Sequence, residues 1–251
     1  KEVWDNYVNI APRFGINSIP SIVTNGLVLR HDFAEYASYP RTGTDLFDIS
    51  GNNNHSTLLG GPTFSNEYGG VLNFDGVDDH TISTTTPTGI GGQVGMTVEG
   101  ITKVNPNAPT RDWVWVTPHT TRSDSRWITG LLWNWTNSRF RAHIAGTGFD
   151  ANPDTPNTFS ATNIKKWNYY CQVYDGSTIK VYVNGELFHT FTGYTNVAVS
   201  NITNVVLGAW KDPGLRILNN QQIGYASIYN RALSQSEVTQ NFNTLRLRYG
   251  I

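Results

Sequence analysis

Short runs of alternating apolar and polar residues dominate the chain from Ser21 onward. The runs are rich in Val, Ile, Thr, Tyr and Trp, and turn residues separate them at intervals of about 8–15 residues. Since side chains of a strand alternate between two faces, this pattern predicts a β protein. The expected strands are residues 26–33, 71–74, 96–104, 113–117, 127–135, 139–144, 168–174, 178–183, 187–191, 204–209 and 223–229.

Two hairpins are predicted by their turn residues. Asp175-Gly176 separates the run that ends at Tyr174 from the run that begins at Thr178, and Asn184-Gly185 follows that second run. Both dipeptides tolerate the positive φ angles of tight hairpin turns. Residues 168–191 are therefore expected to form three consecutive antiparallel strands.

A single helix is predicted, at the C-terminal end of the sequence. Ser234 followed by Glu237 has the spacing of a capping box. The apolar residues after it recur at spacings of four, three and four, which places them on one helical face. They are Val238, Phe242, Leu245 and Tyr249. We expect this face to pack on a β-sheet.

The first twenty residues show neither a helical nor a strand period, and they contain Pro12 and Pro20. We interpret residues 1–20 as an extended N-terminal arm and residues 21–251 as one domain. A single all-β domain fits a chain of 251 residues.

Charge and composition narrow the classes of function. The 18 Lys+Arg and 19 Asp+Glu residues give a net charge of -1 without basic runs, which argues against nucleic acid as a partner. No apolar run reaches the roughly 18 residues of a membrane span, and no leader is recognisable. The sole cysteine, Cys171, shares a strand face with Tyr169 and Val173. It is expected to be a buried apolar residue rather than a disulfide partner or a nucleophile.

Catalytic spacing is absent from the sequence. The six glutamates are scattered, and the 6 histidines stand singly, without the spacing of a zinc site. Neither a Gly-x-Ser-x-Gly turn nor a phosphate-binding loop occurs. Since glycoside hydrolysis needs two carboxyl groups close together, we expect a protein that is not an enzyme.

Two acidic loops are the candidate metal sites. Asp48 and Asn52 lie in the turn-rich segment 48–55, and Asp75 and Asp78 lie in the turn 75–79. Oxygen ligands at short spacing suit Ca²⁺, and if Ca²⁺ binds, we expect the two segments to meet. The alternative is that these side chains accept hydrogen bonds from turn amides. In that case the protein has no cofactor.

Tryptophans form the candidate binding surface. Trp113 and Trp115 share a strand face, as do Trp133 and Trp135 on the next predicted strand. Exposed indole rings stack on the apolar faces of sugars, whereas the same spacing in a sandwich also arises from core packing. Both interpretations stay open from the sequence.

Several motifs follow one another in a fixed order along residues 22–251. They are Gly26-Leu27-Val28-Leu29 with Asp32-Phe33, residues 39–44, residues 48–52, residues 69–76, Thr97-Val98-Glu99, residues 167–176 with 181–185, and residues 224–234. In this order the chain resembles the laminin-G-like, concanavalin A-like lectin/glucanase superfamily, in the form found in bacterial surface proteins and tailed-phage structural proteins. The resemblance implies an all-β jelly-roll sandwich of two antiparallel sheets with one short C-terminal helix.

The resemblance implies binding rather than catalysis, since the carboxylate-bearing strand of the glucanase branch has no counterpart among the six glutamates. A domain that stands nearly alone behind a short arm is similar to virion proteins of this family. We therefore expect a capsid decoration or a tail- or fibre-associated adhesion component on the virion surface of a tailed phage. Its expected partners are other virion proteins or copies of itself, bound through residues 1–20, and cell-surface carbohydrate. The alternative is a secreted, extracellular bacterial carbohydrate-binding module.

Overall fold

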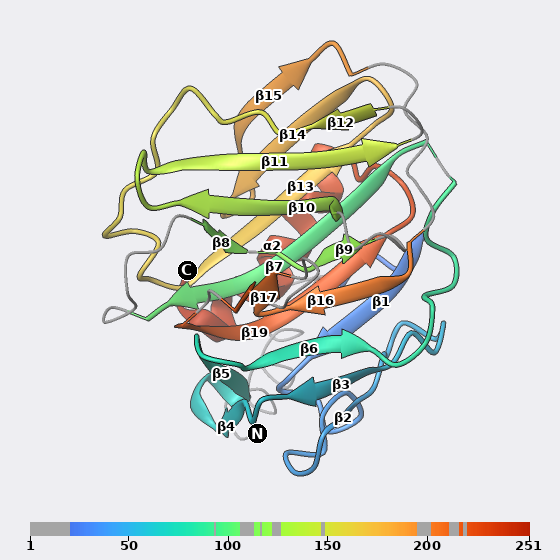
Figure 1. Cartoon of the computed structure of the whole chain (residues 1–251), viewed down its shortest axis with the longest axis vertical. Coiled ribbons are helices and arrows are strands. Elements are labelled where there is room, and N and C mark those ends of the chain that lie inside the picture. The colour runs from blue at the N-terminus through green and yellow to red at the C-terminus, as the bar shows by residue number, and fades with distance from the viewer. Residues whose placement is uncertain are drawn as a thin grey trace, which may run out of the picture.

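The computed structural model describes residues 21–92, 94–105, 113–115, 117–121, 127–146, 149–194, 202–210, 216–217 and 220–251. These residues form two large β-sheets, a small strand pair and a C-terminal helix (Figure 1). The N-terminal arm expected for residues 1–20 lies outside the described residues. That part of the domain prediction therefore stays a prediction.

The first sheet, sheet A, has eight strands within the described ranges. Their order is β15-β14-β13-β7-β19-β5-β4, and β1 also pairs with β19. The strands are β1 (Leu27–Asp32), β4 (Thr63–Ser65), β5 (Val71–Asp75), β7 (Met96–Val104), β13 (Asn168–Tyr174), β14 (Thr178–Val183), β15 (Glu186–Thr192) and β19 (Asn220–Tyr229).

The second sheet, sheet B, has nine strands in the same part of the chain. Their order is β12-β11-β10-β9-β16-β6-β3-β2, and β8 also pairs with β10. The strands are β2 (Asp45–Leu46), β3 (Ser56–Leu59), β6 (His80–Ser83), β8 (Trp113–Trp115), β9 (His119–Thr121), β10 (Trp127–Asn134), β11 (Arg139–Gly146), β12 (Phe149–Ala151) and β16 (Asn204–Leu207). A separate pair consists of β17 (Ala209–Trp210) and β18 (Arg216–Ile217).

The inner faces of the two sheets pack against each other and form the main core. Tyr170 of β13 faces Phe140 of β11, with 5.6 Å between the ring centroids. Val98 of β7 and Leu131 of β10 belong to the same buried cluster. Full burial of each large apolar side chain contributes about 1.5–3 kcal/mol, so the two sheets stabilise each other.

Helix α2 (Gln235–Tyr249) covers the outer face of sheet A, and Figure 1 shows it behind β13 and β7. Its four predicted apolar residues are all buried. They pack with side chains that point outward from the sheet, including Tyr169, Cys171 and Tyr229. The molecule therefore has three layers, with the part of sheet A under α2 buried on both faces. No helix among the described residues is long and apolar enough to span a membrane.

The predicted fold class is confirmed. All strand pairs described are antiparallel, and β13, β14 and β15 form the two hairpins expected at Asp175-Gly176 and Asn184-Gly185. One predicted strand, 204–209, is interrupted at Gly208, because the backbone there has a φ of 79°, in the left-handed region, and not the extended conformation of a strand. Short polar strands such as β3, β6 and β9 were not predicted, since too few residues in them alternate.

A buried carboxylate joins α2 to sheet A. Glu99 of β7 is fully buried and accepts hydrogen bonds from the hydroxyl of Tyr169, from Ser227 Oγ at 2.8 Å and from Asn241 Nδ2 at 3.0 Å. Asn241 lies on α2, and its Oδ1 accepts a bond from the Val23 amide at 2.8 Å. Burial raises the pKa of Glu99, and the three donors oppose that rise. The helix is thus oriented by polar contacts as well as by apolar packing.

A second buried carboxylate holds the other end of the helix. Asp32 at the end of β1 is fully buried and forms ion pairs with Arg248 of α2 at 2.5 Å and with Arg30 at 3.2 Å. Such charge-assisted contacts fix direction as well as distance. The last turn of α2, which carries Tyr249, is therefore fixed relative to sheet A.

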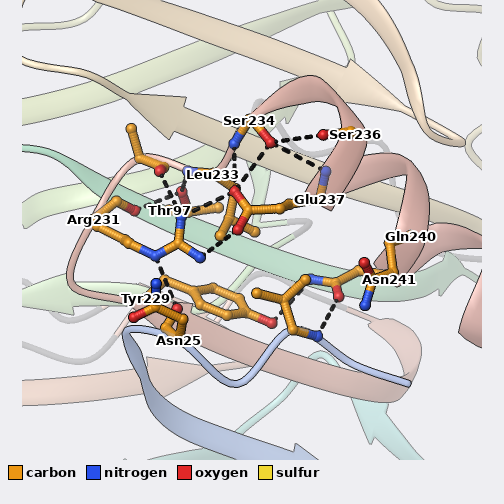
Figure 2. A network of polar contacts seen from close by, with 12 residues as sticks. Asn25, Thr97, Tyr229, Arg231, Leu233, Ser234, Ser236, Glu237, Gln240 and Asn241 are labelled. Atoms are coloured by element: carbon orange, nitrogen blue, oxygen red, sulfur yellow. Dashed lines mark hydrogen bonds and ion pairs between the residues drawn. The ribbon is translucent and has the colours of Figure 1, made fainter. Parts of the chain in front are cut away.

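The N-terminus of α2 is held by the network in Figure 2. Ser234 and Glu237 form the predicted capping box. Arg231 donates to both carboxylate oxygens of Glu237, at 2.6 and 2.9 Å, and to the carbonyl of Asn25 at 2.9 Å. Thr97 Oγ1 donates to the Arg231 carbonyl and accepts from the Leu233 amide. The start of the helix is thus connected to β7 and to the segment before β1.

We predict that Asn241→Ala destabilises the protein by about 3 kcal/mol, because it leaves the Val23 amide without its acceptor and removes a donor from buried Glu99. The urea dependence of unfolding measures the loss. Asn243→Ala, at an exposed position on the same helix, is the matched control and should stay within about 0.5 kcal/mol of the wild type. Equal stability of the two variants would contradict the structural role of Asn241.

The second prediction concerns acid stability. The hydrogen bonds from Arg231 lower the pKa of Glu237 from 4.5 to about 2. The ionised Glu237 therefore stabilises the folded protein at any pH above the pKa of the unfolded state, and this stabilisation disappears as the pH falls toward 2. Glu237→Gln should therefore cost about 1 kcal/mol near pH 7, a modest value because the pair is partly exposed. The difference from wild type should shrink between about pH 5 and pH 2. Unfolding curves at several pH values measure this difference in stability. Glu186→Gln, at an exposed position on β15, is the control. A difference between Glu237→Gln and wild type that does not change with pH would refute the prediction.

Candidate functional site

For Trp133, the prediction of an exposed ligand-binding ring is wrong. Its side chain is fully buried in the core between the sheets, and its Nε1 donates to the Phe159 carbonyl at 3.3 Å. Trp135 is half-buried and packs edge-on against Trp133, with centroids 4.7 Å apart. Since the inner face of β10 looks toward sheet A, Trp133 has no ring face left for a ligand.

The other two candidate tryptophans lie on β8. This strand pairs with β10, so that Trp113 is opposite Asn134 and Trp115 is opposite Leu132. The structure describes the backbone of these two residues and not their side chains. Their predicted role in ligand binding stays a prediction.

The carboxylate of the candidate metal residue Asp48 accepts hydrogen bonds from backbone amides of the protein. Its carboxylate accepts bonds from the amides of Arg30, Ser50 and Asn54 at 2.8 to 3.0 Å. Asn52 Nδ2 donates to the Leu27 carbonyl at 3.0 Å. Both side chains therefore make the turn-stabilising contacts that were the alternative to metal binding.

The second acidic segment lies away from the first. Asp75 and Asp78 are exposed, and together with Asp79 they bring carboxylate oxygens within 4.8 Å of one another. Asp75 Oδ1 accepts the Val77 amide at 2.7 Å. The turn is next to the His80 end of β6, whereas the Asp48 loop is next to the Ser83 end. The expected meeting of the two segments is thus wrong, because opposite ends of one strand pair separate them.

A recess lies at the C-terminal end of α2, on the outer face of sheet A. A pocket of about 520 Å³ has Tyr68, Trp167 and Tyr249 among its walls. A second pocket of about 260 Å³ has Asn73 and Gln222 among its walls. Both pockets are lined by Lys103. We call the two adjoining pockets the α2-end groove.

Three aromatic rings form one wall of the α2-end groove. The Tyr68 ring lies 5.4 Å from Trp167 and 5.8 Å from Tyr249, and the last two are 5.0 Å apart. Trp167 and Tyr249 are buried, whereas Tyr68 is 40% exposed. Tyr68 is therefore a solvent-accessible ring that packs on two buried aromatic rings.

The turn that carries Tyr68 is strained and tightly held. Tyr68 lies in the short 3₁₀ turn η2 (Glu67–Gly69) with φ of 54°, in the left-handed region, which costs a non-glycine residue about 1–2 kcal/mol. Arg41 donates to Asn66 Oδ1 at 3.2 Å and to the Gly69 carbonyl at 3.1 Å. A side chain at Gly70 would meet the Phe33 carbonyl at 2.2 Å, so only glycine permits this approach. These contacts hold the backbone of the turn, and the Tyr68 ring itself is positioned by Trp167 and Tyr249.

Tyr249 reaches its place because β19 has no side chain beneath it. A Cβ at Gly224 would lie 2.2 Å from the Tyr249 hydroxyl oxygen. Gly224 also coincides with the register shift between Ile223 and Tyr225. Burial raises the pKa of Tyr249, so the ring stays neutral at physiological pH. The ring of the last helical residue can thus lie directly on the strand.

A row of polar side chains crosses the floor of the groove. In the sheet register, Asn73 of β5 is opposite Gln222 of β19, and Gln222 is opposite Lys103 of β7. Residues directly opposite each other share one face of a sheet. Gln222 Nε2 donates to Asn73 Oδ1 at 2.7 Å, and Lys103 Nζ lies 5.5 Å from the centroid of the Trp167 ring. The row therefore leads from amide groups to a cation beside the aromatic wall.

Other amides near the larger pocket are occupied by the protein itself. Asn168 Nδ2 donates to the carbonyls of Asn163 and Lys166 at 2.8 and 2.9 Å. Asn184 Nδ2 donates to Asn168 Oδ1 at 3.0 Å, and its own oxygen accepts the Tyr169 amide at 2.9 Å. These groups hold the wall in place and leave ligand contacts to the lysines and the aromatic rings.

The α2-end groove is suited to binding. Of the residues lining its two pockets, Glu67 supplies the one carboxylate side chain. An aromatic wall next to amides and ammonium groups can contact both the apolar face and the hydroxyls of a polar ring. It offers no pair of carboxyl groups for acid–base chemistry.

Sequence reasoning did not identify these residues as a site. Tyr68, Lys103, Trp167 and Tyr249 are separated by at least 35 positions, and no spacing rule connects them. Tyr249 was predicted as one of the apolar residues of the helix, and it does pack there. The signal available in the sequence was the pair Gly69-Gly70 next to an aromatic residue.

Comparisons with known proteins agree with the architecture. The family model of the concanavalin A-like lectin/glucanases superfamily matches residues 72–239, more than half of the 251 residues. A search of curated protein sequences finds no match.

Solved structures with the same fold include domains of bacterial toxins. The receptor binding domain of botulinum neurotoxin D superposes with a TM-score of 0.65 at 13% identity, covering 87% of this chain and 52% of that one. The serotype D ligand binding domain in complex with N-acetylneuraminic acid gives 0.66 at 14%, covering 91% and 54%. The binding domain of Paraclostridial Mosquitocidal Protein 1 gives 0.65 at 15%, covering 88% and 52%. The chain thus spans about half the length of these domains, and the likeness concerns the fold.

Proposed function

The chain belongs to the concanavalin A-like lectin/glucanases superfamily, and from that premise we propose that it is a non-enzymatic domain that binds carbohydrate in the α2-end groove. The observation that carries the proposal is Tyr68, a ring that is 40% exposed and lines the same pocket as Lys103, the end of the row of polar side chains. A sugar ring has an apolar face and a rim of hydroxyls, so it complements an aromatic wall with polar groups beside it.

The rigidity of the wall favours this function. Arg41 donates to Asn66 and Gly69 on either side of the Tyr68 turn, and the Tyr68 ring packs on Trp167 and Tyr249, both of which are buried. A ring that is already fixed loses little conformational entropy when a ligand stacks on it. A small loss of entropy matters for a sugar ligand, because each contact between the protein and the sugar replaces a contact with water and so contributes little net binding energy.

The carboxylates near the α2-end groove support a role without catalysis. Glu99 lies beneath α2 and accepts three side-chain hydrogen bonds, and Asp32 is buried in ion pairs with Arg30 and Arg248. Glu67 alone borders the groove. Hydrolysis of a glycosidic bond uses two carboxyl groups about 5–9.5 Å apart on either side of that bond.

The structural neighbours support the class of function. One of them is a receptor binding domain, and another was solved in complex with N-acetylneuraminic acid. Because this chain spans about half of those domains, the residues that contact their ligands are not carried over to it. Binding to a glycan remains our proposal for this chain.

We predict that Tyr68→Ala weakens glycan binding at least about tenfold, since it removes the exposed ring while leaving the buried pair in place. A glycan array identifies a ligand, and titration calorimetry measures its affinity. The matched control is Phe47→Ala, which removes an aromatic ring that is 38% exposed and lies outside the groove. Undiminished binding by a folded Tyr68→Ala variant would place the ligand elsewhere, and an array without any hit would refute the function itself.

For the biological setting we propose the narrower role expected from the sequence: a structural component of a tailed-phage virion, displayed on the particle surface. The resemblance of residues 22–251 to phage structural proteins of this superfamily supports it. Residues 1–20 would bind other virion proteins or further copies of the chain.

Deleting residues 1–20 should abolish incorporation into particles while the domain stays folded, because the proposed docking segment precedes the sandwich. Mass spectrometry of purified particles and of culture supernatant, with circular dichroism as the folding control, measures both. Retained incorporation would refute the docking role. Recovery of the protein in the supernatant alone would favour the alternative, a secreted bacterial carbohydrate-binding module.

A further inference from the structure

We infer that the α2-end groove selects a negatively charged oligosaccharide, with the carboxylate or sulfate of one sugar beside Lys103 and Lys166 and the next sugar over Gln222 and Asn73. The inference rests on the proposed function, since it names the class of glycan for the same groove. It follows from the charges, the unpaired polar atoms and the order of the two pockets.

The side chains that line the larger pocket carry a positive charge. Lys103 and Lys166 both line it, none of its lining residues has a carboxylate side chain, and Ile251, the last residue of the sequence, lines it as well. The chain as a whole carries a net charge of -1, so this local excess is not a consequence of a basic protein. Positive groups concentrated in a recess attract an anion more strongly than the same charges on an open surface.

Among the residues that the structure describes, Lys103 has no acidic partner, whereas several other cations do. Arg248 pairs with Asp32, Arg231 pairs with Glu237, and Lys180 pairs with Asp175. For Lys103, the contact found in the described part of the chain is the face of Trp167, 5.5 Å from Nζ. A half-exposed ammonium group over an indole ring is held in position while its charge stays available.

The smaller pocket has a different chemical character. Gln222 Nε2 donates to Asn73 Oδ1, and Asn73 Nδ2 donates to the Thr63 carbonyl at 3.1 Å. This chain of bonds uses the Gln222 donor and leaves its Oε1, which is buried, without a hydrogen-bond partner in the protein. An acceptor in this state suits a sugar hydroxyl, which can donate, and does not suit a carboxylate or sulfate.

The aromatic wall contains a matching unpaired donor. Trp167 is 95% buried, and its Nε1 has no partner in the protein. An unpaired buried donor costs about 1–3 kcal/mol, so an anionic oxygen or hydroxyl that reached it would recover part of that cost. The larger pocket thus has the unpaired donor of Trp167 among its walls, and the smaller one has the unpaired acceptor of Gln222 together with the unpaired amide of Gln221.

Glu67 sets the direction of the oligosaccharide. Glu67 lines the smaller pocket together with Lys103, whereas it does not line the larger pocket, which has both Lys103 and Lys166. A negative group placed there would be repelled, while the same group in the larger pocket is attracted. The charged sugar is therefore assigned to the larger pocket and a neutral unit to the smaller one, with Lys103 between them.

The test measures the affinity of the wild type for four hexasaccharides by calorimetry: hyaluronan, which is carboxylated; κ-carrageenan, which is sulfated; and the neutral chitohexaose and cellohexaose. We expect one of the two charged probes to bind at least about tenfold more tightly than either neutral probe. Raising the salt from about 0.05 to 0.5 M should weaken that binding several-fold, because the Debye length shrinks. The comparison of the two charged probes distinguishes a carboxylate from a sulfate.

The variants locate the charge. Lys103→Met and Lys166→Met keep the length of the stem and remove the ammonium group, so each should weaken binding of the charged probe about tenfold. Lys165→Met, whose ammonium group lies over Trp135 outside the groove, is the matched control and should have no effect. Gln222→Leu should weaken binding of the hexasaccharide while leaving binding of its charged monosaccharide unchanged.

The outcomes separate this inference from the proposed function. Neutral probes that bind as tightly as charged ones, or lysine variants that bind like the wild type, would overturn the inference. If Tyr68→Ala still removed that binding, the groove would remain the carbohydrate site. Failure of all four probes and of a wider glycan array would overturn both proposals.

Discussion

The docking of α2 on sheet A is the constraint on which the rest of the structure depends. Apolar packing alone would allow the helix to slide or rotate, but Glu99 is satisfied only when donors from β13, β19 and α2 meet at one point. Displacing any of them would leave a carboxylate unpaired in the interior, at a cost of several kcal/mol. The Asp32–Arg248 pair holds the other end in the same way. Together the two carboxylates determine where Tyr249 lies, and hence where the outer face of sheet A stays uncovered.

The α2-end groove is the uncovered remainder of that face. Beyond Tyr249 the helix ends, and the sheet continues as the row Lys103, Gln222 and Asn73. The turn at Tyr68 adds an accessible ring to the aromatic wall of this space, and its left-handed backbone is accompanied by the Arg41 hydrogen bonds and by the close approach at Gly70. Rigid walls with a few unpaired polar atoms are the features expected of a binding site that is formed before its ligand arrives.

The position of the groove also explains why the shared sandwich says little about the ligand. The two packed sheets are common to this chain and to toxin domains of 13–15% identity. The groove depends instead on the end of a helix, on one strained turn and on two lysines, all of which lie outside the core between the sheets. A fold of this kind can therefore keep its core while its surface changes specificity.

The sequence by itself determined the fold class, the hairpins at Asp175-Gly176 and Asn184-Gly185, and the capped C-terminal helix, because these features depend on periodicity and local turn chemistry. It could not decide between core and surface for Trp133, since both give the same spacing. Only the tertiary structure decided that, by turning β10 toward sheet A. It also decided the candidate site, since Tyr68, Lys103, Trp167 and Tyr249 come together through strand order and helix docking. The physical reason is that local patterns report the environment of one segment, whereas a binding site is a contact among segments that no local pattern connects.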